Sequence, residues 1–124
     1  MEPDAALVQF TARYVESLEQ LEILCLLSRE RDKQWSAKEL FHIVQSSEKS
    51  VAACLEAFHA NGLVAREASG LFRFRPARPE LERSAQALCQ AYHERRVSVI
   101  EMIYRKPGQT VQAFADAFRI RKRE

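Results

Sequence analysis

The segment 66–78 holds the residues of this sequence best suited to binding an anion. It carries four arginines and one acidic residue, a net charge of +3, and the arginines are Arg66, Arg73, Arg75 and Arg78. A guanidinium offers a rigid fork of donors that suits phosphate or carboxylate groups. Arg73 and Arg75 alternate with Phe72 and Phe74, which is typical of a half-buried strand with one polar face. The pattern indicates phosphate recognition, and the alternative is a solvated face or pairing with acids of the first helix.

These arginines must be positioned by a hairpin and by the two helices before it. Residues 63–67 and 71–75 are predicted strands around the turn Ala68-Ser69-Gly70, where glycine supplies a positive φ. Upstream, Ser36-x-x-Glu39 is a capping box that predicts a helix to about residue 45. Ser47 can cap a second helix, which ends at Asn61-Gly62. Only a residue or two separates the helices, so they must turn sharply and cross.

The second of these helices is chemically plain. Its outward residues with a predicted nucleic-acid contact are Ser47, Lys49, Ser50 and Ala53. Residues 36–62 hold two lysines and three glutamates, a net charge of −1. Affinity for nucleic acid comes mainly from neutralising phosphates, so we expect the hairpin arginines (Arg66, Arg73, Arg75 and Arg78) to hold the backbone more than this helix does.

The regions on either side complete a single domain over residues 1–124. Ser17-x-x-Gln20 caps a strongly apolar helix, and residues 4–15 fit either a strand or a helix packed on the domain as an arm. A long helix is predicted from about residue 80 to 106, and Arg95 alone breaks its apolar seam. A short amphipathic helix with a basic end is predicted over residues 110–124, with Phe114 and Phe118 on its apolar face.

The long helix has too little polar surface near its end to stand in water alone. We therefore predict that it forms a homodimer, and the alternative is that it folds back over a monomeric core. The predicted interface residues share the apolar face: Leu81, Ala85, Leu88, Tyr92, Val99, Met102 and Ile103.

The fold class predicted is mainly α with a small β-hairpin. The order of capped helix, capped helix, HANGLV and a hairpin containing RFR resembles the winged helix-turn-helix superfamily, in particular the bacterial MarR, PadR and TrmB regulator families. The residues that match the end of the recognition helix are Leu55, Phe58, Gly62, Leu63 and Val64. The flanks SLEQLEILCLL (17–27) and FADAFRIRK (114–122) are similar to segments of small bacterial winged-helix proteins. The resemblance covers residues 17–76 and implies a homodimeric transcriptional regulator that binds double-stranded DNA.

Winged helices also bind proteins, and the second hypothesis is an interaction module without DNA binding. The acidic first half, where residues 1–62 have a net charge of −4 against +6 for residues 63–124, favours this alternative. The alanine-rich face of the second helix of the motif favours it as well. A protein partner would then dock through residues 110–124.

Other functional classes find little support in the sequence. There is no nucleophile triad, H-E-x-x-H motif or glycine-rich phosphate loop, so we expect neither an enzyme nor a cofactor. His42, His59 and His93 fall on three different predicted helices, and no metal site is expected. No apolar run is long enough to cross a bilayer and no secretory signal is visible, so a cytoplasmic protein without a membrane partner is the expectation.

The cysteines Cys25, Cys54 and Cys89 are scattered among apolar residues, which argues against a disulfide framework. We expect them to be small buried hydrophobic side chains. A thiol sensor built on any of the three is the alternative.

Overall fold

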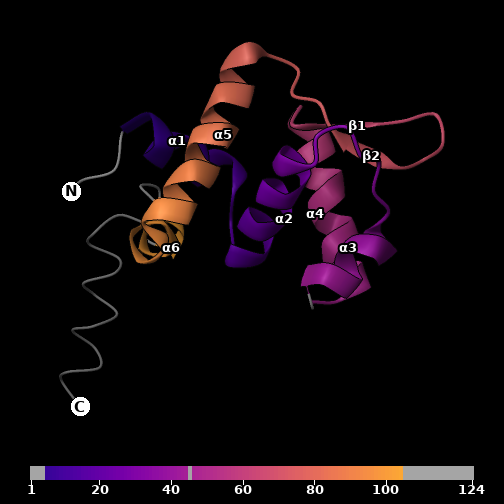
Figure 1. The fold of residues 1–124 in the computed structure, drawn as a ribbon, viewed down its shortest axis with the longest axis horizontal. Coiled ribbons are helices and arrows are strands. Elements are labelled where there is room, and N and C mark those ends of the chain that lie inside the picture. The colour runs from indigo at the N-terminus through magenta and orange to yellow at the C-terminus, as the bar shows by residue number, and fades with distance from the viewer. Residues whose placement is uncertain (1–4, 45, 105–124) are drawn as a thin grey trace.

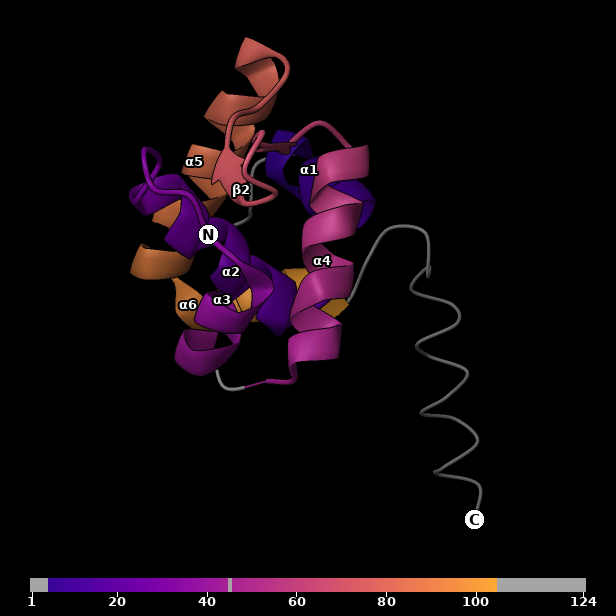
Figure 2. The ribbon, with the colours of Figure 1, turned by 90° about the vertical axis from the view of Figure 1, so that its right-hand side faces the viewer.

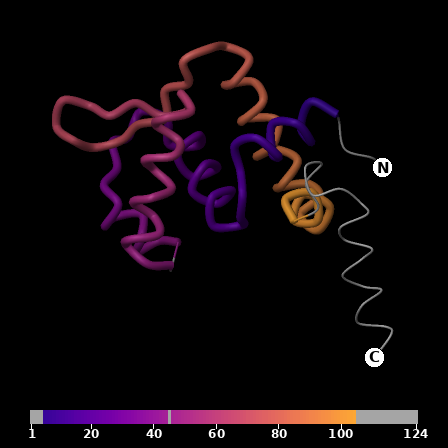
Figure 3. Tube along the Cα trace, turned by 180° about the vertical axis from the view of Figure 1, so that it is seen from behind, coloured from indigo at the N-terminus to yellow at the C-terminus, as the bar shows by residue number. Residues whose placement is uncertain are grey.

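The computed structural model describes residues 5–44 and 46–104, and over these ranges it contains six helices and a two-stranded sheet (Figure 1). The bounds are α1 Ala5–Tyr14, α2 Leu18–Arg29, α3 Ala37–Val44, α4 Glu48–Ala60, β1 Val64–Arg66, β2 Phe72–Phe74, α5 Pro79–Glu94 and α6 Arg96–Tyr104. The prediction of a mainly α chain with a small β-hairpin is confirmed. The hairpin and α6 lie at opposite ends of the molecule (Figures 1 and 3).

The ambiguous segment near the start is a helix, α1. Its buried face consists of Leu7, Phe10 and Thr11, which recur at the three- and four-residue spacing of a helix. The Phe10 and Tyr14 rings lie one turn apart, with centroids separated by 5.0 Å. α1 packs against α5 and α6, so the arm closes on the last third of the chain.

The Ser36 capping box forms as predicted, and in the Ser17 box the returning bond comes from Glu16, one residue before the cap. The Ser17 hydroxyl accepts from the Gln20 backbone N–H at 3.2 Å, and the Gln20 side chain accepts in turn from the N–H of Glu16 at 2.8 Å. Ser36 and Glu39 exchange two such bonds, each 3.1 Å long. Each box satisfies backbone donors that the first turn of a helix leaves without an intrahelical partner. These local contacts fix where α2 and α3 begin.

α4 begins and ends where the sequence predicts. The Ser47 hydroxyl accepts from the N–H of Ser50 at 3.0 Å, and after the helix Gly62 has a φ of 79°. A Cβ on Gly62 would meet the Cβ of Ala77 at 3.3 Å, so glycine allows both the left-handed backbone and the close approach. α3 and α4 pack against each other across the short turn, as Figure 2 shows from the side.

The hairpin joins the helical core through its apolar residues. β1 and β2 pair antiparallel with Val64 opposite Phe74, and Gly70 in the turn has a φ of 91°. Phe72 also forms a bridge to Trp35, with backbone hydrogen bonds of 2.7 and 2.8 Å in the two directions. The segment between α2 and α3 therefore adds a third, very short strand position to the sheet. Trp35, Phe72 and Phe74 are all buried.

The prediction of one long helix over residues 80–106 is wrong, because the chain turns at Arg95. This residue has φ −138° and ψ 65°, outside the helical region, and α5 stops directly before it while α6 starts directly after it. A straight helix would carry Val99 and Ile103 away from the core, and the turn instead leaves them 3% and 1% exposed. The one polar residue of the seam thus sits at the corner, where a guanidinium can reach solvent.

α6 closes the fold by returning to the start of α2. The backbone N–H of Leu18 donates to the Tyr104 hydroxyl at 3.1 Å, which satisfies a donor of the first turn of α2. α6 also packs on α5 and α1. The predicted end of the long helix at Lys106 and the predicted terminal helix from Thr110 lie outside the described residues.

Candidate nucleic-acid interface and thiol pocket

The structure leaves few free donors on α4. Ser47 uses its hydroxyl as a helix cap, and Ser50 donates its own hydroxyl to Glu19 at 2.7 Å. Lys49 is exposed and forms no ion pair with any residue of the described ranges. Ala53 is exposed as well. Of the four positions predicted on this helix, Lys49 is therefore the one charged donor.

The outer surface of α4 is smooth and slightly acidic. Ala53, Ala57 and Ala60 are exposed and carry no side chain beyond Cβ, while Glu56 is exposed among them. The apolar stripe on the other side is buried, and it consists of Val51, Cys54, Leu55 and Phe58. A helix with such a low outer profile can approach another surface closely. The outer surface of α4 therefore offers a partner a close fit and little charge.

Arg66 is held against α4 by two contacts. Its guanidinium forms an ion pair with Glu56, and it lies over the Phe72 ring with Cζ 4.9 Å from the ring centroid. The acid comes from the predicted reading helix itself. Because the pair is exposed, it contributes little stability, but it places the first hairpin arginine beside the outer surface of α4.

Arg73 and Arg75 share one carboxylate. Arg73 Nε lies 3.5 Å and Arg75 Nη1 lies 4.0 Å from the same oxygen of Glu67. Glu67 is 20% exposed, whereas Arg75 is 65% exposed, so the acid is sheltered under a cation that reaches into solvent. The two arginines therefore do lie on the same side of the hairpin, as their alternation predicts.

The fourth of these arginines, Arg78, lies after the hairpin as the N-cap residue of α5 and pairs with Glu80 at 3.9 Å. All four hairpin arginines thus have an acidic partner, and the acids belong to α4, to the segment after β1 and to α5. None of these acids lies on the first helix, which the sequence offered as the source of partners. Three glutamates against four arginines leave a net charge of +1 on this surface.

The residues predicted to form a dimer interface lie mainly in the core of the single chain. Six of them are between 0% and 8% exposed: Leu81, Ala85, Leu88, Val99, Met102 and Ile103. They are covered by the packing of α5 and α6 on each other and on α1 and α2. Tyr92 is half-buried and lines a pocket instead. This arrangement matches the alternative prediction, in which this segment folds back over the core of its own chain.

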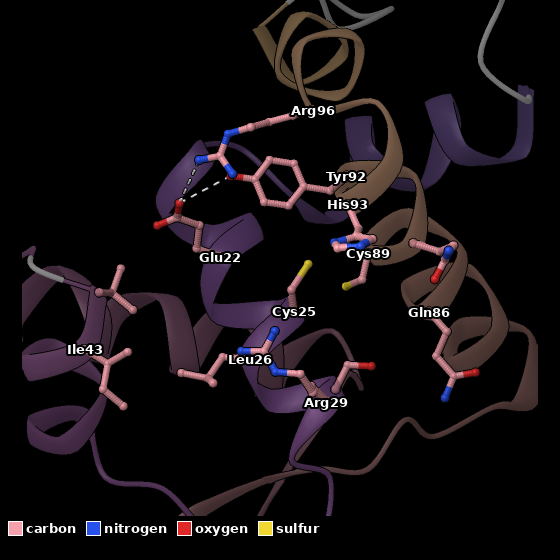
Figure 4. A pocket seen from close by; sticks show the side chains of 13 residues that line it. Glu22, Cys25, Leu26, Arg29, Ile43, Gln86, Cys89, Tyr92, His93 and Arg96 are labelled. Atoms are coloured by element: carbon pink, nitrogen blue, oxygen red, sulfur yellow. Dashed lines mark hydrogen bonds and ion pairs between the residues drawn. The ribbon is translucent and has the colours of Figure 1, made fainter.

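A pocket of about 700 Å³ opens between α2, α3 and α5 (Figure 4). One of its walls is a polar cluster in which Glu22 is the common partner. The Tyr92 hydroxyl donates to Glu22 at 3.3 Å, and Arg96 lies 3.7 Å from the same carboxylate and 4.7 Å from the centre of the Tyr92 ring. Burial first, and then the Glu22 charge, raise the pKa of Tyr92. The volume is within the range of small-ligand sites.

Two of the three thiols meet in this pocket, which we call the thiol pocket. Cys25 projects from α2 and Cys89 from α5, and Figure 4 shows their sulfur atoms directed toward each other. The two side chains lie close enough that the Cys25 thiol, together with burial, raises the pKa of Cys89. Nothing in the spacing of the sequence brings them together, because the contact depends on how α2 and α5 cross.

Cys54 is the exception among the cysteines. It is 2% exposed in the core under α4, and burial raises its pKa to about 12. It therefore matches the expectation of a small buried hydrophobic residue. Cys25 and Cys89 are half-buried and reach the thiol pocket.

His42, His59 and His93 lie on α3, α4 and α5 respectively, as the sequence predicts. Among residues 5–44 and 46–104, no three His, Cys, Asp or Glu side chains gather in a way that could hold a metal ion. In the same ranges no helix is both long enough and apolar enough to span a bilayer. Comparisons with protein-family models, curated proteins and solved structures gave no match, so the likeness to winged-helix regulators stays a prediction from the residues themselves.

Proposed function

We propose that the protein binds double-stranded DNA as a winged-helix module. The observation that carries this proposal is the juxtaposition of α4, with its low outer surface, and the basic hairpin that follows it directly. Helices of this kind enter the major groove with their amino-terminal residues toward the bases. Lys49 and Ala53 are exposed on that part of α4, where a lysine can reach a base edge or a phosphate and a methyl group can contact thymine.

The hairpin arginines supply the grip on the backbone in this proposal. Their ion pairs do not prevent this, because exposed pairs are worth only about 0–1 kcal/mol each. An arginine can exchange a carboxylate for a phosphate at small cost. Arg75 is the best placed, since it is 65% exposed and 4.0 Å from its acid. The bridge from Trp35 to Phe72 holds the end of β2 next to the turn, so the tip of the hairpin can lie at a defined angle to α4.

The test measures binding to random-sequence duplex DNA at low salt by fluorescence anisotropy. We expect micromolar, salt-sensitive binding that is lost in the double variant Arg73→Ala with Arg75→Ala. The control removes the same charge elsewhere: Arg13→Ala with Arg83→Ala, on α1 and α5, should retain most of the affinity. Absence of salt-sensitive binding, or equal loss in both double variants, contradicts the proposal.

A homodimer is part of this proposal, since paired half-sites are the usual arrangement for such regulators. The interface must use surfaces other than the buried seam. Val97 and Tyr104 on α6 are large apolar side chains that are 69% and 55% exposed. Light scattering should give twice the chain mass of 14.3 kDa at high concentration. A species at 14.3 kDa under those conditions contradicts the dimer.

A second candidate is a protein-interaction module. It is favoured by the pairing of every hairpin arginine with an acid, which leaves the surface almost neutral. The alanines of α4 would then be a docking face. Recovery of one stoichiometric protein partner, lost in Ala53→Arg and retained in the Arg73→Ala with Arg75→Ala variant, would favour the module over DNA binding. The reverse pattern favours DNA.

A further inference from the structure

We propose that Cys25 and Cys89 form a modification site, a dithiol that a hydroperoxide converts into a disulfide linking α2 to α5. The two side chains enter the thiol pocket from opposite helices with their sulfurs facing each other (Figure 4). They already interact as thiols. The inference is independent of DNA binding.

Access distinguishes this pair from the third cysteine. Cys25 and Cys89 are half-buried and line a pocket of about 700 Å³, which a small peroxide can enter. Cys54 is 2% exposed and is not part of that lining. Oxidation of cysteine follows thiolate character and exposure. The structure therefore selects one pair of the three thiols.

The chemistry requires only the peroxide. One thiolate attacks a peroxide oxygen, so that an S–O bond forms, the O–O bond breaks and hydroxide leaves. The second thiolate then attacks the sulfenic sulfur, which forms the S–S bond and releases the oxygen as water after protonation. In sum, two thiols and one hydrogen peroxide give one disulfide and two waters.

The surroundings of Cys89 favour its protonated thiol, and one nearby cation, Arg29, favours its thiolate. The hydrogen bond to Cys25 and burial raise the pKa of Cys89, while the nearby Arg29 guanidinium acts in the opposite direction. Arg29 also lines the pocket and forms no ion pair among the residues described. Cys89 therefore holds its proton in the resting protein, and Arg29 favours its thiolate when it reacts.

The disulfide would enclose the whole motif. Between Cys25 and Cys89 the chain forms the end of α2, then α3, α4, the hairpin and most of α5. A crosslink that closes so long a loop reduces the freedom of the unfolded chain. We therefore expect the oxidised protein to melt at a higher temperature than the reduced protein, by several degrees.

The test treats the reduced, desalted full chain with hydrogen peroxide at low protein concentration. We expect free thiols to fall from three to one per chain and the intact mass to fall by two hydrogen atoms. Peptide mapping without reductant should find the Cys25 and Cys89 peptides joined, and dithiothreitol should restore all thiols. Because this mapping uses the wild-type protein, the result does not depend on any variant folding.

Variants sharpen the assignment. Cys25→Ser and Cys89→Ser should each abolish the internal disulfide, while Cys54→Ala, the matched control, should retain it. The proposal is overturned if the wild type keeps three thiols, if the only products carry added oxygen or join two chains, or if the linked peptides include Cys54. Equal melting temperatures of oxidised and reduced protein would overturn the predicted stabilisation by the crosslink.

Discussion

Glu67 controls how much positive charge the hairpin offers to a ligand. Its carboxylate neutralises Arg73 at 3.5 Å and Arg75 at 4.0 Å. The change Glu67→Gln keeps the size of the side chain and removes this charge. In the proposed function, both arginines then no longer exchange an acid for a phosphate when DNA binds, so the affinity for DNA should rise.

The magnitude follows from the exposure of the two pairs. Arg73 is 26% exposed, so its pair is at the upper end for surface ion pairs, about 1 kcal/mol. Arg75 is 65% exposed, and its pair is worth only about 0.3 kcal/mol after screening by solvent. The sum corresponds to a gain of about tenfold in the affinity for DNA at low salt.

The assay is an anisotropy titration of random-sequence duplex at several salt concentrations. Glu101→Gln on α6 is the matched control, because it changes net charge by the same amount at an exposed position on another element. Only the local change should give the tenfold gain. Equal gains in the two variants would show that net charge alone acts. Weaker binding by Glu67→Gln would refute the assignment of Arg73 and Arg75 to the DNA backbone.

Three further predictions concern the fold. Phe58→Ala should lower the free energy of unfolding by about 3–5 kcal/mol in urea titrations, because Phe58 is 0% exposed. The control, Ala57→Gly at an exposed position of the same helix, should cost about 1 kcal/mol. A near-neutral Phe58 variant would contradict the burial of this face of α4. Gly62→Ala should cost about 1–2 kcal/mol, because its φ is 79° and its new Cβ would press on Ala77, and no change in urea midpoint would contradict that backbone. Burial raises the pKa of Cys54 from 9.0 to about 12, so the folded protein holds this proton more tightly than the unfolded chain. The free energy of unfolding is therefore unaffected by this thiol below about pH 9, and it falls by about 4 kcal/mol as the pH rises to about 12. Unfolding measured across this range should show a smaller alkaline loss in Cys54→Ala than in the wild type, and parallel losses would contradict it.

Local signals in the sequence predicted the first half of the motif well. Ser17, Ser36 and Ser47 cap the helices that they were expected to cap, because a cap is a contact between residues three positions apart. Gly62 and Gly70 have the positive φ that a helix end and a tight turn require. Information of this kind is complete within a few residues and needs no tertiary structure.

The corner at Arg95 shows what local signals omit. Residues 80–104 satisfy a helical pattern throughout, and a continuous helix satisfies the backbone equally well. The decision lies in burial: the corner allows Val99, Met102 and Ile103 to reach the core formed by α1 and α5. Arg95 was visible as the exception in the seam, but whether an exception bends the chain depends on what is available to cover the residues beyond it.

The candidate sites depend still more on distant contacts. Arg66 finds Glu56 on the preceding helix, and Cys25 finds Cys89 on a helix far along the chain. Pairs of this kind are set by the angle at which elements cross. The positions of the hairpin arginines could thus be predicted from sequence, whereas their acidic partners and the paired thiols could not.

The packing of α1 on α5 and α6 has a consequence for synthesis of the chain. During synthesis α1 finds α5 and α6 only after residues 79–104 have followed it, so Leu7 and Phe10 stay uncovered until then. The motif between them must gather first, and its two flanks then close over it together. Removal of either flank should therefore expose apolar surface on the other and promote aggregation.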